Sequence, residues 1–176
     1  GRDPVTPIPR LEIDLEKICH NAHALVRQLT SIGISVTGVT KATLGSPAIA
    51  AALIRGGVAG LGDSRIENLE TLYGSGVPAP LTLIRSPMRS QAARVVACAD
   101  TSCNTEPTVL AALSAEACKA SRTHGIVLML ELGDLREGIM PADVDSVVRD
   151  TLRLPNLTLE GIGCNLACRS GVSPDA

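Results

Sequence analysis

The sequence of 176 residues is nearly without aromatic side chains, with one Tyr and no Phe or Trp. Proteins that bind single-stranded nucleic acids stack the bases on aromatic rings, and this sequence offers almost none. Its formal net charge of −2 also gives no broad basic surface for a phosphate backbone. We therefore expect no nucleic-acid partner, and a core built from Val, Ile, Leu, Ala and Met.

Long apolar runs are also missing, since no stretch approaches the roughly 20 apolar residues that span a bilayer. The first ten residues lack the apolar centre of a secretion signal. These two absences predict that the protein does not associate with membranes and is cytoplasmic.

The six cysteines form no C-x-x-C pair, and their spacing matches no common zinc site. We expect no metal site, and thiols that are reduced and mostly buried. A content of 45% hydrophobic residues is typical of a globular chain. Residues 1–10 are predicted to be an N-terminal tail, and residues 11–176 a single domain.

Short apolar segments alternate with segments of helical periodicity along the domain. The first segment, 11–15, alternates apolar and polar residues as a half-buried strand does. Asp14 is placed to cap a helix over 17–29. Six further strands are predicted at 35–40, 58–62, 81–84, 101–103, 126–132 and 157–163.

A polar residue closes each of these six strands, and these are Lys41, Asp63, Arg85, Asn104, Asp134 and Asn165. Their separations of 19 to 31 residues fit one strand, one helix and two short loops. Such units form a parallel sheet covered by helices, with active sites at the carboxyl ends of the strands.

The pattern favours a (β/α)8 TIM-type barrel over a dinucleotide-binding sheet. No Gly-x-Gly-x-x-Gly motif follows the first strand, and polar residues end every strand instead of gathering at one switch point. A closed barrel has eight βα units, whereas about six are visible here. We therefore expect an incomplete α/β barrel, the N-terminal portion of a domain that lacks its last strands.

Lys41 is the residue on which the functional hypothesis depends. It follows a short apolar strand and precedes a loop rich in small residues. An amine held at such a strand end, partly removed from water, is a plausible nucleophile for a carbonyl compound such as pyridoxal phosphate (PLP). A lysine that caps the strand and points into water is the alternative interpretation.

Four segments occur in order at 36–41 (VTGVTK), 61–68 (LGDSRIEN), 131–138 (ELGDLREG) and 161–166 (GIGCNL). With them the chain resembles the alanine racemase-like family of PLP enzymes, and within it the alanine/ornithine racemase branch. The resemblance covers residues 10–174. It implies a fold type III barrel, PLP as cofactor, and an isomerase that interconverts the L- and D-forms of alanine, ornithine or a similar amino acid. It also implies a homodimer of the full-length protein.

The resemblance assigns a role to the matched residues. Lys41 would hold PLP through a Schiff base, and would then move the substrate Cα proton on one face. Arg136 would bind the substrate carboxylate, a task that suits a bidentate guanidinium. A surface ion pair of Arg136 with Asp134 or Glu137 is the alternative.

Four further positions are implied to contact the cofactor. Asn165 stands where alanine racemases usually carry a histidine near the cofactor ring. Asp63 and Ser64 belong to the second-strand motif that lines the site, although a structural role in the loop is the alternative. Asn104 closes the fourth strand and is the remaining expected contact.

The second catalytic base cannot be named from the sequence. Tyr73, the one tyrosine, lies on a predicted helix where that role is not expected. His20, His23 and His124 are placed on helices or their ends, and we expect them at the surface.

Three other functions remain open at this point. A non-catalytic PLP-homeostasis protein shares the barrel and the lysine, although a carboxylate-binding arginine favours the racemase. A D-amino-acid aldolase or dehydratase would need a metal or an added domain. The chain could also be an inactive fragment of the barrel.

Overall fold

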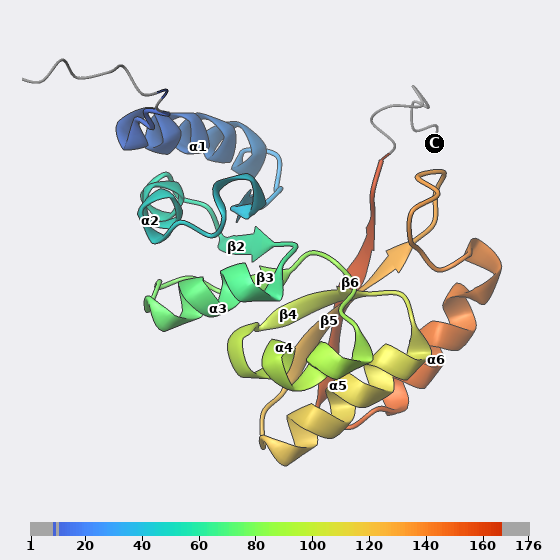
Figure 1. Cartoon of the computed structure of the whole chain (residues 1–176). Helices are drawn as coiled ribbons and strands as arrows, with labels where there is room; N and C mark the ends of the chain where they lie inside the picture. The colour runs from blue at the N-terminus through green and yellow to red at the C-terminus, as the bar shows by residue number, and fades with distance from the viewer. Residues whose placement is uncertain (1–8, 10, 167–176) are drawn as a thin grey trace, which may run out of the picture.

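The computed structural model of the chain describes residue 9 and residues 11–166. Six parallel strands form one sheet in sequential order, and the helices that alternate with them cover one of its faces (Figure 1). The strands are β1 (Thr37–Val39), β2 (Gly60–Asp63), β3 (Leu81–Leu83), β4 (Thr101–Asn104), β5 (His124–Leu130) and β6 (Leu157–Cys164).

The helices precede, connect and follow these strands. The α-helices are α1 (Leu15–Thr30), α2 (Pro47–Arg55), α3 (Ile66–Gly74), α4 (Ala92–Cys98), α5 (Pro107–Lys119) and α6 (Val144–Arg153). Three short 3-10 helices are η1 (Lys41–Thr43), η2 (Arg89–Gln91) and η3 (Pro141–Asp143). The prediction of six βα units in one parallel sheet is confirmed.

Each strand pairs with its neighbours in sequence, as the repeated βα pattern predicts. Between β5 and β6 the register shifts at Ile126/Val127. Within the described residues, β1 and β6 each pair on one side only.

Local sequence explains where the helices begin. The Asp14 carboxylate accepts hydrogen bonds from the backbone N–H groups of Glu16 and Lys17, at 3.0 and 3.1 Å, and so caps α1 as predicted. Pro47 and Pro107 occupy the first turns of α2 and α5, where a missing N–H costs no hydrogen bond.

The predicted strand at 11–15 is wrong. Residues 11–14 form no strand, and Leu15 is already the first residue of α1. Leu11 and Ile13 are 86% and 46% exposed. An alternation of apolar residues becomes a strand only where a neighbouring strand supplies hydrogen bonds and burial, and the described part of the chain has none beside this segment.

The hydrophobic core lies between the sheet and the helices. Leu61 of β2 and Ile126 of β5 are fully buried there, against apolar residues of α3, α4 and α5. On the opposite face of the sheet, which we call the open face, a Cβ on Gly62 would approach Ile84 and Thr37. The helices therefore cover one face of the sheet and leave the other to form the site.

His124 contradicts the prediction that all three histidines lie at the surface. His20 and His23 are exposed, but His124 is 1% exposed at the start of β5, and its Nε2 lies 2.8 Å from the Ser102 Oγ of β4. Burial lowers the pKa of His124 to about 4. The imidazole is therefore neutral at physiological pH and belongs to the core.

The prediction of reduced, mostly buried cysteines agrees only in part with the structure. The five described ones are all free; Cys98 and Cys103 are buried, Cys19 is half-buried, and Cys118 and Cys164 are exposed. Cys168 lies outside the described residues. Of the helices in the described ranges, none combines the length and apolar character that crossing a membrane requires.

Candidate active site

Lys41 follows β1 after a single intervening residue, Thr40, and opens η1, as expected for a residue delivered by a strand. Its position is fixed by its neighbour Thr40, which is fully buried and whose N–H donates to the Gly62 carbonyl of β2 at 2.9 Å. Lys41 itself is exposed, because within the described residues no element covers the open face here. The expected partial removal of this amine from water is therefore not seen in this structure.

Asp63 holds the end of β1 to the end of β2. Its fully buried carboxylate accepts a hydrogen bond from the Thr40 hydroxyl at 2.7 Å. It also accepts from the Asn68 amide at 3.0 Å and from the Arg65 N–H at 2.9 Å. These three donors satisfy the buried carboxylate with neutral groups. Asp63 thus positions the residue that precedes Lys41 and does not itself face a cavity.

The loop after Lys41 is also tightly packed, against Asn68. Gly45 has φ +67°, and a Cβ there would lie 2.8 Å from the Asn68 Cβ and 2.9 Å from the Asn68 carbonyl oxygen. The Thr43 hydroxyl donates to the Thr40 carbonyl at 2.9 Å. Both ends of η1 are therefore anchored to the Asp63 network.

The segment 131–138, which we call the clasp loop, leaves β5 and returns to its end. The Ile139 N–H donates to the Met129 carbonyl at 2.8 Å, and the Glu131 N–H donates to the Ile139 carbonyl at 2.9 Å. Gly138 makes this return possible, since a Cβ there would lie 2.4 Å from the Glu131 nitrogen. The Glu131 carboxylate accepts hydrogen bonds from the backbone N–H groups of Gly133 and Leu135, which lie within the same loop.

The clasp loop brings Arg136 to the same cavity as Lys41. This cavity, the lysine pocket, has a volume of about 480 Å³. Its polar lining is formed by Lys41, Ser64, Arg85, Arg136, Glu137 and Asn165. Ile84, Cys103 and Met129 of the open face complete it.

A second cavity, the arginine pocket, adjoins the lysine pocket and has a volume of about 740 Å³. The two share Ser64, Arg85 and Glu137. Arg65 and Arg89 also line the arginine pocket, and the described part of the chain offers no carboxylate paired with either of them or with Arg85.

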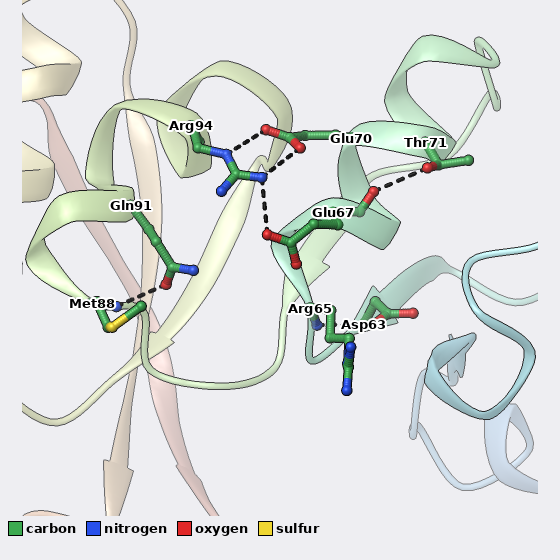
Figure 2. A network of polar contacts seen from close by, with 8 residues as sticks. All are labelled: Asp63, Arg65, Glu67, Glu70, Thr71, Met88, Gln91 and Arg94. Carbon is green, nitrogen blue, oxygen red and sulfur yellow. Dashed lines mark hydrogen bonds and ion pairs between the residues drawn. The ribbon is translucent and has the colours of Figure 1, made fainter.

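Helix α3 lines the arginine pocket through Ile66 and Glu67, and Arg94 of α4 connects α4 to α3 (Figure 2). The Arg94 guanidinium donates to both carboxylate oxygens of Glu70 at 2.7 Å and to Glu67 at 3.0 Å. These hydrogen bonds raise the pKa of Arg94 and lower that of Glu70. Glu67, which lines the pocket, is thereby already paired.

The structure brings together some of the predicted site residues and not others. Lys41, Ser64, Arg136 and Asn165 line one pocket. Asn104 does not line it, although it is fully buried; its amide donates to the Ser102 carbonyl and hydroxyl, both at 2.9 Å. Asp63 and Asn104 therefore bond to neighbouring residues in this structure, and direct cofactor contact stays a prediction for Asp63, Ser64, Asn104 and Asn165.

Arg136 also shows the ion pair given above as the alternative. Its Nε donates to Asp134 at 2.5 Å. This pair orients the guanidinium but does not exclude substrate binding, since a guanidinium has five N–H donors. Tyr73 is 57% exposed on α3 and lines neither pocket.

Five residues of the lysine pocket were missed as site residues by the sequence reasoning: Ile84, Arg85, Cys103, Met129 and Glu137. Alternation along β4 and β5 could have indicated Cys103 and Met129, because every second strand residue faces the same side. Burial and, secondarily, the charge of Glu137 raise the pKa of Cys103 to about 11. The thiol is therefore protonated at neutral pH and is unsuited to act as a base there.

The lysine pocket fits PLP in its chemistry. An aldehyde that carries a phosphate needs a primary amine and positive charge, and the pocket offers Lys41 together with the guanidinium groups of Arg85 and Arg136. The Ser64 hydroxyl and the Asn165 amide add neutral donors. Its volume lies within the range of roughly 300–1,000 Å³ that is usual for small-molecule sites.

Comparison with known proteins identifies amino-acid racemases as relatives of this chain. The sequence matches the family model described as alanine racemase, N-terminal domain, over residues 13–175. It is 34% identical to the lysine racemase of Thermotoga maritima, over 94% of this chain and 46% of that protein. It is 33% identical to the ornithine racemase of Acetoanaerobium sticklandii, over 94% of this chain and 47% of that protein. The chain thus spans about half the length of these curated relatives.

Solved structures agree on the fold. The alanine racemase of Clostridium difficile 630 in complex with cycloserine superposes with a TM-score of 0.78 at 18% identity, over 92% of this chain and 44% of that one. Similarity at this identity shows the fold alone, and it confirms the barrel-type α/β architecture. With the model match over nearly all of its length, the chain belongs to the alanine racemase N-terminal domain family.

Proposed function

We propose that this chain carries the cofactor-binding lysine of a PLP-dependent amino-acid racemase, which interconverts the L- and D-forms of a small or basic amino acid. The observation that carries the proposal is that Lys41 and Arg136, the two residues matched to family roles, line one pocket although they lie 95 residues apart. The lysine and ornithine racemases among the relatives support an amino acid as substrate.

Each residue of the pocket has a task in this mechanism. Bound PLP would supply the electron sink that makes the Cα proton of an amino acid acidic. Lys41 would hold the cofactor and move that proton on one face of the substrate. Arg136 would bind the substrate carboxylate, with Asp134 orienting its guanidinium. Ser64 and Asn165 would donate hydrogen bonds to the cofactor.

Accurate placement of the Lys41 amine depends on the Asp63 network. Proton transfer requires the amine to lie within hydrogen-bond reach of the Cα proton, so a small displacement is costly. Thr40, held by Asp63 and by the Gly62 carbonyl, fixes the backbone directly before Lys41. The same proposal includes a homodimer of the full-length protein, which the family resemblance implies, and a cytoplasmic location, which the lack of a secretion signal and of long apolar runs in the sequence predicts.

The test is to locate the bound cofactor by chemistry. PLP is added to the full-length protein, borohydride reduces the adduct, and peptide mass spectrometry locates the label. We expect the label on Lys41 in the wild type and in Lys119→Ala, which changes an exposed lysine on α5, and no label in Lys41→Ala. A folded wild type without label on Lys41 would overturn the proposal.

Racemisation is then followed by chiral chromatography with alanine, ornithine and lysine. Turnover of at least one of them that is lost in Lys41→Ala supports the racemase. Labelling of Lys41 without turnover of any amino acid would instead favour the non-catalytic PLP-binding protein.

A further inference from the structure

Glu137 carries a carboxylate for which the mechanism above has no use. It is half-buried and lines both the lysine pocket and the arginine pocket. With the described residues it forms neither a hydrogen bond nor an ion pair. A carboxylate partly withdrawn from water is stabilised by a cation that approaches it, and the border of the two pockets is open to such a group.

The backbone of Glu137 is held in place. The next residue, Gly138, is pressed against the start of the clasp loop, and Ile139 is hydrogen-bonded to the end of β5. The carboxylate lies near enough to Cys103 for its charge to contribute to the raised pKa of that thiol. Glu137 is therefore a fixed negative charge at the inner wall of the lysine pocket.

Side chains of both charges line the lysine pocket. Among the described residues, Lys41, Arg85 and Arg136 give the lysine pocket three cationic groups, and Glu137 is its one carboxylate. An α-carboxylate would be bound by a guanidinium, which leaves Glu137 for a positive group elsewhere on the same ligand. The adjoining arginine pocket, at about 740 Å³, gives a side chain longer than a methyl group room to extend past Glu137.

We propose that Glu137 binds the side-chain ammonium of a diamino acid such as lysine or ornithine, while Arg136 binds the α-carboxylate; this inference rests on the racemase function proposed above. Glu137 is then the residue that selects a basic substrate. An acidic side chain would have to be bound by Arg65, Arg85 or Arg89, which are all exposed and solvated, against the repulsion of the half-buried Glu137.

The test compares substrates that differ in one charge. Lysine and norleucine have side chains of similar length with and without the terminal amine, and glutamate carries the opposite charge. Glu137→Gln keeps the shape and removes the charge, whereas Glu137→Asp keeps the charge. Asp145→Asn is the control, since Asp145 is an exposed carboxylate on α6 that lines neither pocket.

In the full-length protein we expect Glu137→Gln to lower the ratio of kcat/KM for lysine to kcat/KM for norleucine by roughly 10- to 100-fold, the effect of losing a hydrogen bond to a charged group. Glu137→Asp should retain more of this ratio than Glu137→Gln, and Asp145→Asn should leave it unchanged. Because the Glu137 side chain makes no hydrogen bond or ion pair with the described residues, Glu137→Gln should keep the wild-type unfolding midpoint.

The failures of the two proposals are distinguishable. A wild type that racemises amino acids but keeps its lysine-to-norleucine ratio in Glu137→Gln would overturn the role of Glu137 alone. A wild type that prefers glutamate would also overturn it, in favour of side-chain binding by the arginines of the arginine pocket. A wild type that takes no label on Lys41 and racemises nothing would overturn both the function and the inference.

Discussion

Lowering the pH should destabilise this protein through one buried side chain, His124. The imidazole is 1% exposed and its pKa is lowered from 6.5 to about 4 by burial, against an opposing backbone hydrogen bond at Ala99. Below pH 6.5 the unfolded chain therefore binds a proton that the folded chain refuses until about pH 4. Stability must fall as the pH falls through this window.

The magnitude follows from the two pKa values. One pKa unit corresponds to about 1.4 kcal/mol, so the full effect of His124 below pH 4 is about 3 kcal/mol. Between pH 7 and pH 5 the same linkage gives a loss of about 2 kcal/mol in the free energy of unfolding. This is a large share of the roughly 5–15 kcal/mol that stabilises a typical domain.

Urea denaturation at pH 7 and pH 5 tests this. The wild type and His20→Gln, which changes an exposed histidine of α1, should show the same pH dependence. His124→Gln should lose about 2 kcal/mol less than they do over this interval, whatever its stability at pH 7. Equal pH dependence in all three proteins would refute the reasoning. NMR titration of the wild-type imidazole provides an independent measurement, and a His124 pKa near 6.5 would refute it equally.

Two other predictions concern the framework of the site. Asp63→Ala leaves the Thr40 hydroxyl without its buried acceptor, so urea denaturation should show a loss of about 1–3 kcal/mol, against less than about 0.5 kcal/mol for the exposed Asp145→Ala; equal losses would contradict the role of the network. Gly138→Ala forces a Cβ onto the end of β5 and should cost about 1–3 kcal/mol by the same assay. At Gly74 a Cβ meets nothing within 4 Å, so Gly74→Ala should not destabilise; a harmless Gly138→Ala would show that the clasp loop is not so constrained.

The sheet could be predicted from the sequence because its signals are local. The apolar segments are bounded by turn residues, and the distances between them leave room for one helix each. The strand predicted at 11–15 was wrong because a local signal was its only basis. Five alternating residues do not reveal whether a neighbouring strand exists. The prediction that His124 is exposed was wrong for a related reason. The burial of His124 depends on Ser102, 22 residues earlier, and on the register of β4 with β5.

The candidate site was predictable only in part. The motifs identified Lys41 and Arg136, but they could not show that Asp63 and Asn104 turn toward the interior of the protein and bond to their neighbours. The distinction between lining and supporting residues depends on which way a strand end faces. Glu137 could not be predicted as a site residue for another reason. Next to Arg136 in the sequence, it has the pattern of a surface ion pair, and only the fold shows that it lines a cavity.

The arrangement explains how the Lys41 backbone can be held accurately although the side chain is exposed. Lys41 gains no rigidity from its own burial, so its position must come from the backbone on either side of it. On one side the buried carboxylate of Asp63 holds Thr40, and on the other the close contact of Gly45 with Asn68 holds the loop. Asn68 itself donates to Asp63, so both anchors meet at one residue of β2. Loss of the Asp63 carboxylate should therefore disturb the position of the lysine from both sides at once.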